Sequence, residues 1–96
     1  MPLFVIQWKD RVPEGAAIRA ATRAAHLEWA AGQPLTIKLG GPFLTADDGM
    51  AGSLIIVEAP DLAAAKVFHA DDPYTKAGLY ETSSVEPWRV TLPWKD

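Results

Sequence analysis

The apolar segment at residues 2–8, PLFVIQW, constrains the fold of this chain more than any other stretch. Leu3 and Val5 share one face of a strand, because alternate residues point to opposite sides. Phe4, Ile6 and Trp8 share the other face. Both faces are apolar, which predicts a strand in the middle of a sheet that is covered on both sides.

The rest of the chain predicts two helices and three more strands. Residues 12–34 are rich in alanine and arginine, and Gly32 and Pro34 follow as stop signals for a helix. Asp61 is the expected N-cap of a second helix over residues 61–70. Further strands are expected over residues 35–44, 52–59 and 78–92, and Pro87 makes the last of these an edge strand.

The resulting order, β-α-β-β-α-β, predicts a single domain over residues 1–96 of the α+β class. This order is typical of a ferredoxin-like βαββαβ sandwich, with an antiparallel sheet and two main helices on one face. No helix remains for the other face, which is also apolar. We therefore expect a homodimer that forms through the open sheet face.

Composition excludes several classes of protein. Hydrophobic residues make up 49% of the 96 residues and charged residues 22%, which is typical of a globular domain. The net charge of −3 argues against a nucleic-acid partner, and the absence of cysteine excludes disulfides and thiolate chemistry. The N-terminal apolar run is too short for a signal peptide or a membrane span, so we expect a cytoplasmic location and no membrane partner.

Three basic residues of the first helix lie at helical spacing. Arg19, Arg23 and His26 stand at i, i+4 and i+7, which places them along one rim. Such a rim is either a solvated arginine face or a binding site for something negative. The core-facing stripe beside it is expected to consist of Ile18, Ala21, Thr22, Ala25 and Trp29.

The segment DDPY at residues 71–74 ends the second helix and directs a carboxylate and a phenol sideways. In a ferredoxin-like sandwich the helices lie side by side, so His26 and Asp72 could meet. A carboxylate beside one ring nitrogen raises the basicity of the imidazole. Arg23 would then hold an anionic or carbonyl-bearing ligand. Such a site suits proton transfer, as in isomerisation, elimination or lactone rearrangement, without a metal or organic cofactor.

Five segments in order carry a family resemblance: RAAHL, GGP, GSLIIVEA, DDPYTKAGLYE and VEPW. Together they resemble the YCII-related domain family along nearly the whole chain. The resemblance implies a ferredoxin-like subunit of a dimeric α+β barrel, similar to muconolactone isomerase and small ring-modifying oxygenases. It also implies an active site built on a His–Asp pair, at His26 and Asp72. Arg23, Ser53 and Tyr74 match the family's segments as well, and we expect them to bind substrate.

Several residues keep two interpretations. His69 with Asp71 and Asp72 could suggest a metal site, but a partly exposed helical histidine is the preferred interpretation. The Tyr74 hydroxyl either donates to a substrate or its ring closes the end of the helix. Trp88 and Trp94 either cover the dimer seam or form an aromatic wall for a ring-shaped ligand. The segment at residues 40–42 is expected to be a bulge or bend where its strand leaves the sheet.

The sequence thus favours a small acid–base enzyme, lyase- or isomerase-like, that acts on a small aromatic or carboxylated metabolite. The alternatives are a non-catalytic ligand-binding or accessory domain and a protein with only an interaction role. A direct hydrogen bond between His26 and Asp72 beside an open pocket would favour the enzyme. A long separation or a filled pocket would favour the alternatives.

Overall fold

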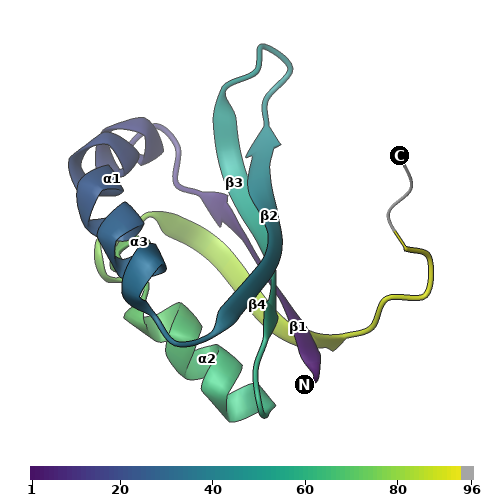
Figure 1. Cartoon of the computed structure of the whole chain (residues 1–96). Helices are drawn as coiled ribbons and strands as arrows, with labels where there is room; N and C mark the ends of the chain where they lie inside the picture. The colour runs from purple at the N-terminus through teal and green to yellow at the C-terminus, as the bar shows by residue number, and fades with distance from the viewer. Residues whose placement is uncertain (94–96) are drawn as a thin grey trace.

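The computed structural model describes residues 1–93 of the chain, which form one antiparallel sheet and three helices (Figure 1). The strands are β1 (Leu3–Asp10), β2 (Thr36–Leu44), β3 (Met50–Glu58) and β4 (Tyr80–Trp88). The helices are α1 (Gly15–Gly32), α2 (Leu62–Asp71) and α3 (Pro73–Lys76). The strand order β2-β3-β1-β4 is that of a ferredoxin-like α+β fold, so the predicted fold class is confirmed.

The apolar segment at the N-terminus lies in the middle of the sheet, as predicted. Val5 of β1 pairs with Ile56 of β3 on one side and with Glu86 of β4 on the other. β4 is an edge strand, and Pro87 lies within it. A proline is tolerated there because an edge strand has one side with no ladder to form.

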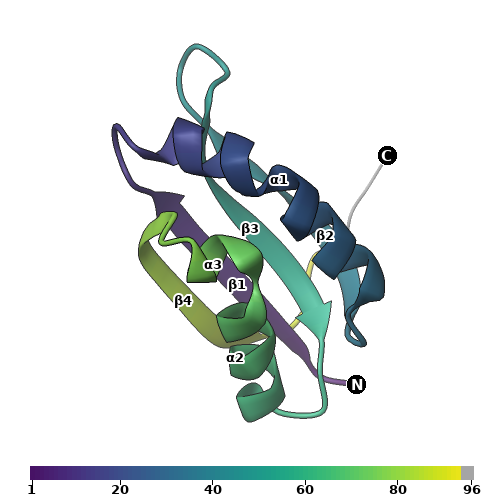
Figure 2. The same cartoon turned by 90° about the vertical axis from the view of Figure 1, so that its left-hand side faces the viewer.

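The core lies between the sheet and the helices. Figures 1 and 2 show the helices together on one face of the sheet. The core cluster consists of buried residues from β1, β3, the loop after β3, and α2: Phe4, Ile6, Trp8, Val57, Ala59, Ala65 and Phe68. Asp61 caps α2 as expected, because its carboxylate accepts the Ala64 N–H at 2.8 Å.

Helix α1 is rotated relative to the prediction. Ala21 and Ala25 are exposed, whereas Arg19 and His26 are half-buried on the inward side with Trp29. The predicted core stripe is therefore wrong in two of its positions. Alanine is apolar but has little surface to bury, whereas Trp29 packs against Phe68 with ring centroids 4.8 Å apart. α1 packs chiefly against α3 and spans the sheet over β2 and β3 (Figure 2).

The Gly-Gly-Pro segment lies within β2, which corrects the expectation of a bend there. Gly40 pairs with Ile55, and a Cβ atom on Gly40 would lie 2.6 Å from the Ile55 side chain. The register shifts flank the segment, between Ile37 and Leu39 and between Phe43 and Leu44. Gly40 therefore lets the edge strand lie close to β3, where a larger side chain would clash, whereas a Cβ atom on Gly41 would meet nothing within 4 Å.

Helix α3 follows α2 directly and was not expected from the sequence. Asp72 ends α2 and caps α3, because its Oδ1 accepts the Tyr74 backbone N–H at 2.9 Å. Pro73 fits the first position of a helix, where no N–H is needed. The Asp-Asp-Pro-Tyr segment thus redirects the chain into a second helix, which ends before Gly78 with a φ of 77°.

No helix in the described residues 1–93 is both long enough and apolar enough to cross a membrane.

Candidate active site

A cavity of about 420 Å³ lies between α1 and the sheet. Its size falls in the range of small-molecule sites, and most of its lining is apolar with a few polar groups. The lining residues come from α1, α3, β1, β2 and β3: Trp8, Arg19, Ala20, Arg23, His26, Leu27, Trp29, Ala30, Ile37, Gly41, Pro42, Met50, Ser53, Ile55 and Tyr74. The rotation of α1 therefore places the polar side chains of Arg19, Arg23 and His26 along the cavity, where a purely apolar helix face would pack against the sheet and fill it.

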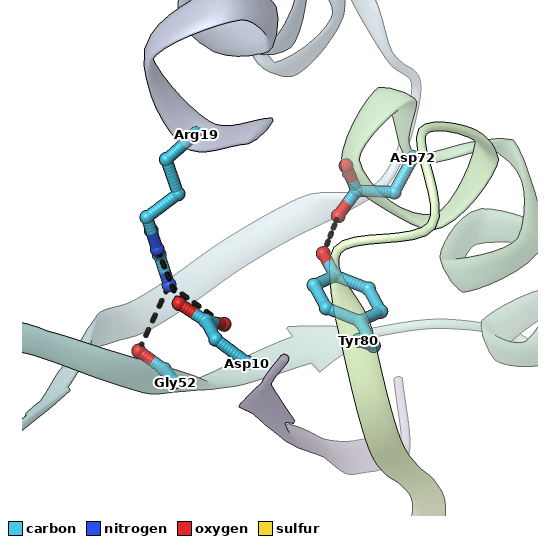
Figure 3. Close-up of polar contacts among 5 residues, drawn as sticks. All are labelled: Asp10, Arg19, Gly52, Asp72 and Tyr80. Carbon is cyan, nitrogen blue, oxygen red and sulfur yellow. Dashed lines mark hydrogen bonds and ion pairs between the residues drawn. The ribbon is translucent and has the colours of Figure 1, made fainter. Parts of the chain in front are cut away.

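Asp72 is a buried carboxylate beside this cavity, with an exposed fraction of 1%. Its Oδ1 accepts the Tyr74 backbone N–H at 2.9 Å, and its Oδ2 accepts the Tyr80 hydroxyl at 2.8 Å (Figure 3). Buried charge is tolerated only where such partners replace water. Burial raises the pKa of Tyr80 far above its usual 10.0, and the charge and hydrogen bond of Asp72 add to this, so Tyr80 stays a donor.

His26 meets Asp72 across the gap between α1 and α3. The His26 Nε2 lies 3.7 Å from the Asp72 Oδ1, which is an ion-pair distance and longer than a hydrogen bond. The imidazole stacks on the Tyr74 ring with centroids 4.2 Å apart. Burial lowers the pKa of His26 below its usual 6.5, Asp72 opposes this, and Arg19 and Arg23 add to the lowering. The net lowering of the His26 pKa favours the neutral imidazole.

The three remaining predicted site residues line the cavity, as His26 does. Arg23 is exposed and lies at the rim of the cavity on α1. Ser53 is half-buried on β3, opposite Trp8 of β1. Tyr74 is buried, with an exposed fraction of 6%, and its ring stacks on the imidazole of His26 and lies 5.5 Å from the guanidinium carbon of Arg19. The structure thus brings together His26, Asp72, Arg23, Ser53 and Tyr74, residues from both halves of the chain.

Two polar groups of the site were missed by the sequence reasoning. The Tyr80 hydroxyl donates to Asp72. The feature of the sequence that could have indicated this contact is the position of Tyr80, eight residues after Asp72 and at the start of a strand. Asp10 was missed as well, because an acid at a strand end is ordinary in a sequence. In the structure it pairs with Arg19, whose rim the sequence leaves open between a solvated face and a binding site for something negative.

His69 lies behind Asp72 and packs on the aromatic rings of β1 and β4. Its ring is 5.4 Å from Tyr80 and 5.9 Å from Trp8, centroid to centroid. Burial lowers the pKa of His69 below 6.5. Within residues 1–93, no group of three or more His, Asp or Glu side chains is placed to hold a metal ion. Asp71, the other acid considered for such a site, is exposed.

Trp88 takes no part in the cavity described above. Trp88 lies at the end of β4 with an exposed fraction of 42% and is absent from the lining of this cavity. It pairs in register with Leu3 of β1. Trp94 falls outside the described residues, so its predicted role stays a prediction.

Comparisons with known proteins agree with this arrangement. The family model of the YCII-related domain matches residues 3–89. Protein YciI of Escherichia coli is 34% identical over 98 residues, which cover 91% of this chain and 96% of that protein. These matches span nearly the whole chain, as the ordered segments of the sequence do.

Solved structures show the same fold. The 5-chloro-2-hydroxyhydroquinone dehydrochlorinase of Burkholderia phenoliruptrix, in complex with 2,5-dihydroxybenzoquinone, is 38% identical with a TM-score of 0.76. The match covers 91% of this chain and 93% of that one. An antibiotic biosynthesis monooxygenase is 17% identical with a TM-score of 0.56, covers 96% of this chain and 100% of that one, and shows the fold alone. Because the family model covers residues 3–89 and the relatives match over nearly their whole length, the chain belongs to the YCII-related domain family.

Proposed function

We propose that this protein is a small acid–base enzyme of the lyase type that acts on a hydroxylated six-membered ring. The observation that carries the proposal is the imidazole of His26, which lines the cavity beside the buried carboxylate of Asp72. The similar dehydrochlorinase, 38% identical, acts on a chlorinated hydroxyhydroquinone and was solved with a dihydroxybenzoquinone. A planar ring of that size fits a cavity of about 420 Å³.

The proposed chemistry is an elimination. His26 removes a proton from the ligand, and the electron pair left behind forms a double bond. The leaving group then departs with the electrons of the bond that breaks. The step needs no oxidant, reductant or organic cofactor. Asp72 stabilises the imidazolium that forms, because its charge favours the protonated ring. The same residues would support an isomerisation if the proton returned to another atom.

The remaining residues have supporting roles in this proposal. Ser53 and the Tyr74 hydroxyl bind ring hydroxyls, and Arg23 attracts anionic ligands at the exposed rim of the cavity. The apolar lining around them excludes water from the ring. Exclusion of water strengthens each electrostatic contact within the site.

The test is chloride release from 5-chloro-2-hydroxyhydroquinone by the wild type and by His26→Gln. We expect the variant to lose at least about 100-fold in kcat/KM, which is the lower range for loss of a general base. Glu28→Gln, on the exposed side of α1, is the matched control for glutamine substitution on the same helix. Thermal melting of each variant reports folding. Equal activity of wild type and His26→Gln would contradict the role of His26.

The second candidate is a non-catalytic ligand-binding domain. The separation of 3.7 Å between His26 and Asp72 favours it, because a general base held by its carboxylate is commonly hydrogen-bonded. Binding of 2,5-dihydroxybenzoquinone without turnover of any chlorinated or hydroxylated ring would support this candidate. Chloride release that depends on His26 would exclude it.

We also propose that the protein forms a homodimer through the open sheet face. A cytoplasmic location stays a prediction. On this face Leu39 is 55% exposed and Trp88 is 42% exposed. Exposed large apolar side chains on a face that no helix covers favour a partner there. We expect a dimer in sedimentation at micromolar concentration and a monomer for Leu39→Asp. A monomeric wild type would contradict this part of the proposal.

A further inference from the structure

Trp8 of β1 lines the cavity and also packs on Tyr80, which does not line it. The indole has an exposed fraction of 4%. Its centroid lies 4.3 Å from that of the Tyr80 ring and 5.9 Å from that of the His69 ring. Trp8 therefore contacts both the space for a ligand and the tyrosine whose hydroxyl binds Asp72.

Packing against two neighbouring rings holds the Tyr80 ring. Its hydroxyl donates to the Asp72 Oδ2 at 2.8 Å (Figure 3), while its ring contacts those of Trp8 and His69. The hydroxyl sits at the end of a rigid ring, so any shift of the ring also moves the hydroxyl. A hydrogen bond weakens steeply when its distance or angle departs from the optimum. The Trp8 contact thus bears on the Tyr80–Asp72 hydrogen bond.

The indole occupies this place at a cost to stability. Its Nε1 is buried, and no group within the described residues 1–93 accepts a hydrogen bond from it. A buried tryptophan N–H usually has a partner, and leaving it without one is unfavourable. A phenylalanine would fill much of the same space without this cost. Stability alone is therefore a poor reason for tryptophan here, which favours a role in the site.

Trp8 adds no charge to the surroundings of His26. The groups around the imidazole that carry or can acquire a charge come from α1, from α3 and from the residue before α3: Arg19, Arg23, Asp72 and Tyr74. Because Trp8 is neutral, it can act on His26 in only two ways. It can change how much water reaches the imidazole, or it can change the Tyr80–Asp72 hydrogen bond.

We propose that Trp8 is a positioning residue, which holds the Tyr80 ring so that its hydroxyl stays on Asp72, the carboxylate that faces His26. This inference rests on the proposed function, because His26 is the proposed base. Without the indole, the Tyr80 hydroxyl is less firmly held against Asp72. The carboxylate then acts more strongly on the imidazole and makes it more basic.

The experiment is an NMR titration of the His26 ring protons in Trp8→Leu, in Tyr80→Phe and in the double variant. We expect Trp8→Leu to raise the His26 pKa by part or all of the rise seen in Tyr80→Phe. The double variant should show no rise beyond that of Tyr80→Phe, because both changes act through one hydrogen bond. Trp8→Phe keeps a ring against Tyr80, so its His26 pKa should lie closer to that of the wild type.

Phe4→Leu is the matched control for loss of a buried aromatic ring. Phe4 lies on the same strand and the same sheet face as Trp8, and both have an exposed fraction of 4%. The control should lower the melting temperature and leave the His26 pKa unchanged. Thermal melting of every variant confirms folding. Trp8→Met, which keeps more of the side-chain volume, takes the place of Trp8→Leu if that variant does not fold.

The outcomes separate this inference from the proposed function. An equal rise on the wild-type and Tyr80→Phe backgrounds would assign the effect to water in the cavity and overturn the role of Trp8. No rise in Trp8→Leu would overturn it as well. Either result leaves the proposed reaction in place, because the titration uses no substrate. A rise that requires Tyr80, in a protein that releases no chloride, would support the role of Trp8 and overturn the proposed reaction alone.

Discussion

At the scale of single residues, the two carboxylate oxygens of Asp72 contact three partners. Its Oδ1 caps α3 and faces His26, whereas its Oδ2 accepts the Tyr80 hydroxyl. Each partner competes for the same negative charge, because a hydrogen bond that stabilises the carboxylate makes it a weaker acceptor for the others. The basicity of His26 therefore depends on Tyr80, a residue that His26 does not pair with.

We predict that Tyr80→Phe raises the pKa of His26. Without the hydroxyl, the charge of Asp72 acts more strongly on the imidazole and opposes the lowering that burial causes. An NMR titration of the His26 ring protons measures this shift without any substrate. Tyr74→Phe is the matched control, since Tyr74 contacts Asp72 through its backbone N–H. An unchanged His26 pKa in Tyr80→Phe would show that this hydroxyl does not tune the site.

Helix α3 is short, but at the scale of elements it supports α1. The N-terminal end of α3 is capped by Asp72, and its C-terminal end is followed by Gly78, whose φ of 77° favours glycine. The Gly78 N–H donates to the Thr75 carbonyl at 3.1 Å, and the Gly78 carbonyl accepts the Arg11 Nε at 2.8 Å. Because α1 packs chiefly on α3, this turn also holds the helix that carries His26.

We predict that Gly78→Ala lowers the free energy of unfolding by about 1 kcal/mol, because a Cβ atom strains a residue in the left-handed region. Gly32→Ala is the matched control at the end of α1, where a Cβ atom would meet nothing within 4 Å. That control should leave stability unchanged or raise it slightly. Urea denaturation of both variants measures the difference. Equal stability of the two variants would contradict the role of the turn.

Sequence reasoning predicted elements with strong periodicity and missed those that depend on tertiary contacts. The strand at residues 2–8 was recognisable because both of its faces are apolar, and its central place in the sheet followed. Ala21 and Ala25 misled the assignment of the inward face of α1, because the Arg19–Asp10 pair and the Trp29–Phe68 contact decide its rotation. Helix α3 has only four residues and no period to detect.

Part of the site could also be predicted from the sequence. His26 and Asp72 were singled out from the helical spacing, the segment at residues 71–74 and the family resemblance, and the structure places them 3.7 Å apart. Tyr80 and Asp10 could not be singled out, because a tyrosine or an acid at a strand end is common. Their roles depend on partners that lie eight or more residues away in the chain.

At the scale of the whole molecule, both histidines of the chain carry a stability cost at acidic pH. Burial lowers the pKa of His26 and of His69 below 6.5. The unfolded chain therefore takes up protons at a higher pH than the folded chain does. In this window the unfolded state binds more protons, so the free energy of unfolding rises with pH.

We predict that stability falls as the pH is lowered from about 7.5 to about 5.5, which stays above the range where most carboxylates titrate. Denaturant melts at a series of pH values measure the slope. The double variant His26→Gln, His69→Gln should have a flatter profile over the same window. A wild type whose stability is constant or rises toward acidic pH would contradict the lowered pKa values.

The small residues that line the cavity under α1 determine how much space the cavity offers. Ala20, Ala30 and Gly41 line it with the smallest side chains available, on a helix and a strand that face one another. Enlarging any of them would reduce the space for a ring while leaving the imidazole, the buried acids and the inward arginine untouched. If the proposed function holds, exchanging these three positions would change which ring substituents fit beside an unchanged His26 and Asp72, and the same positions offer a route to redesigned specificity.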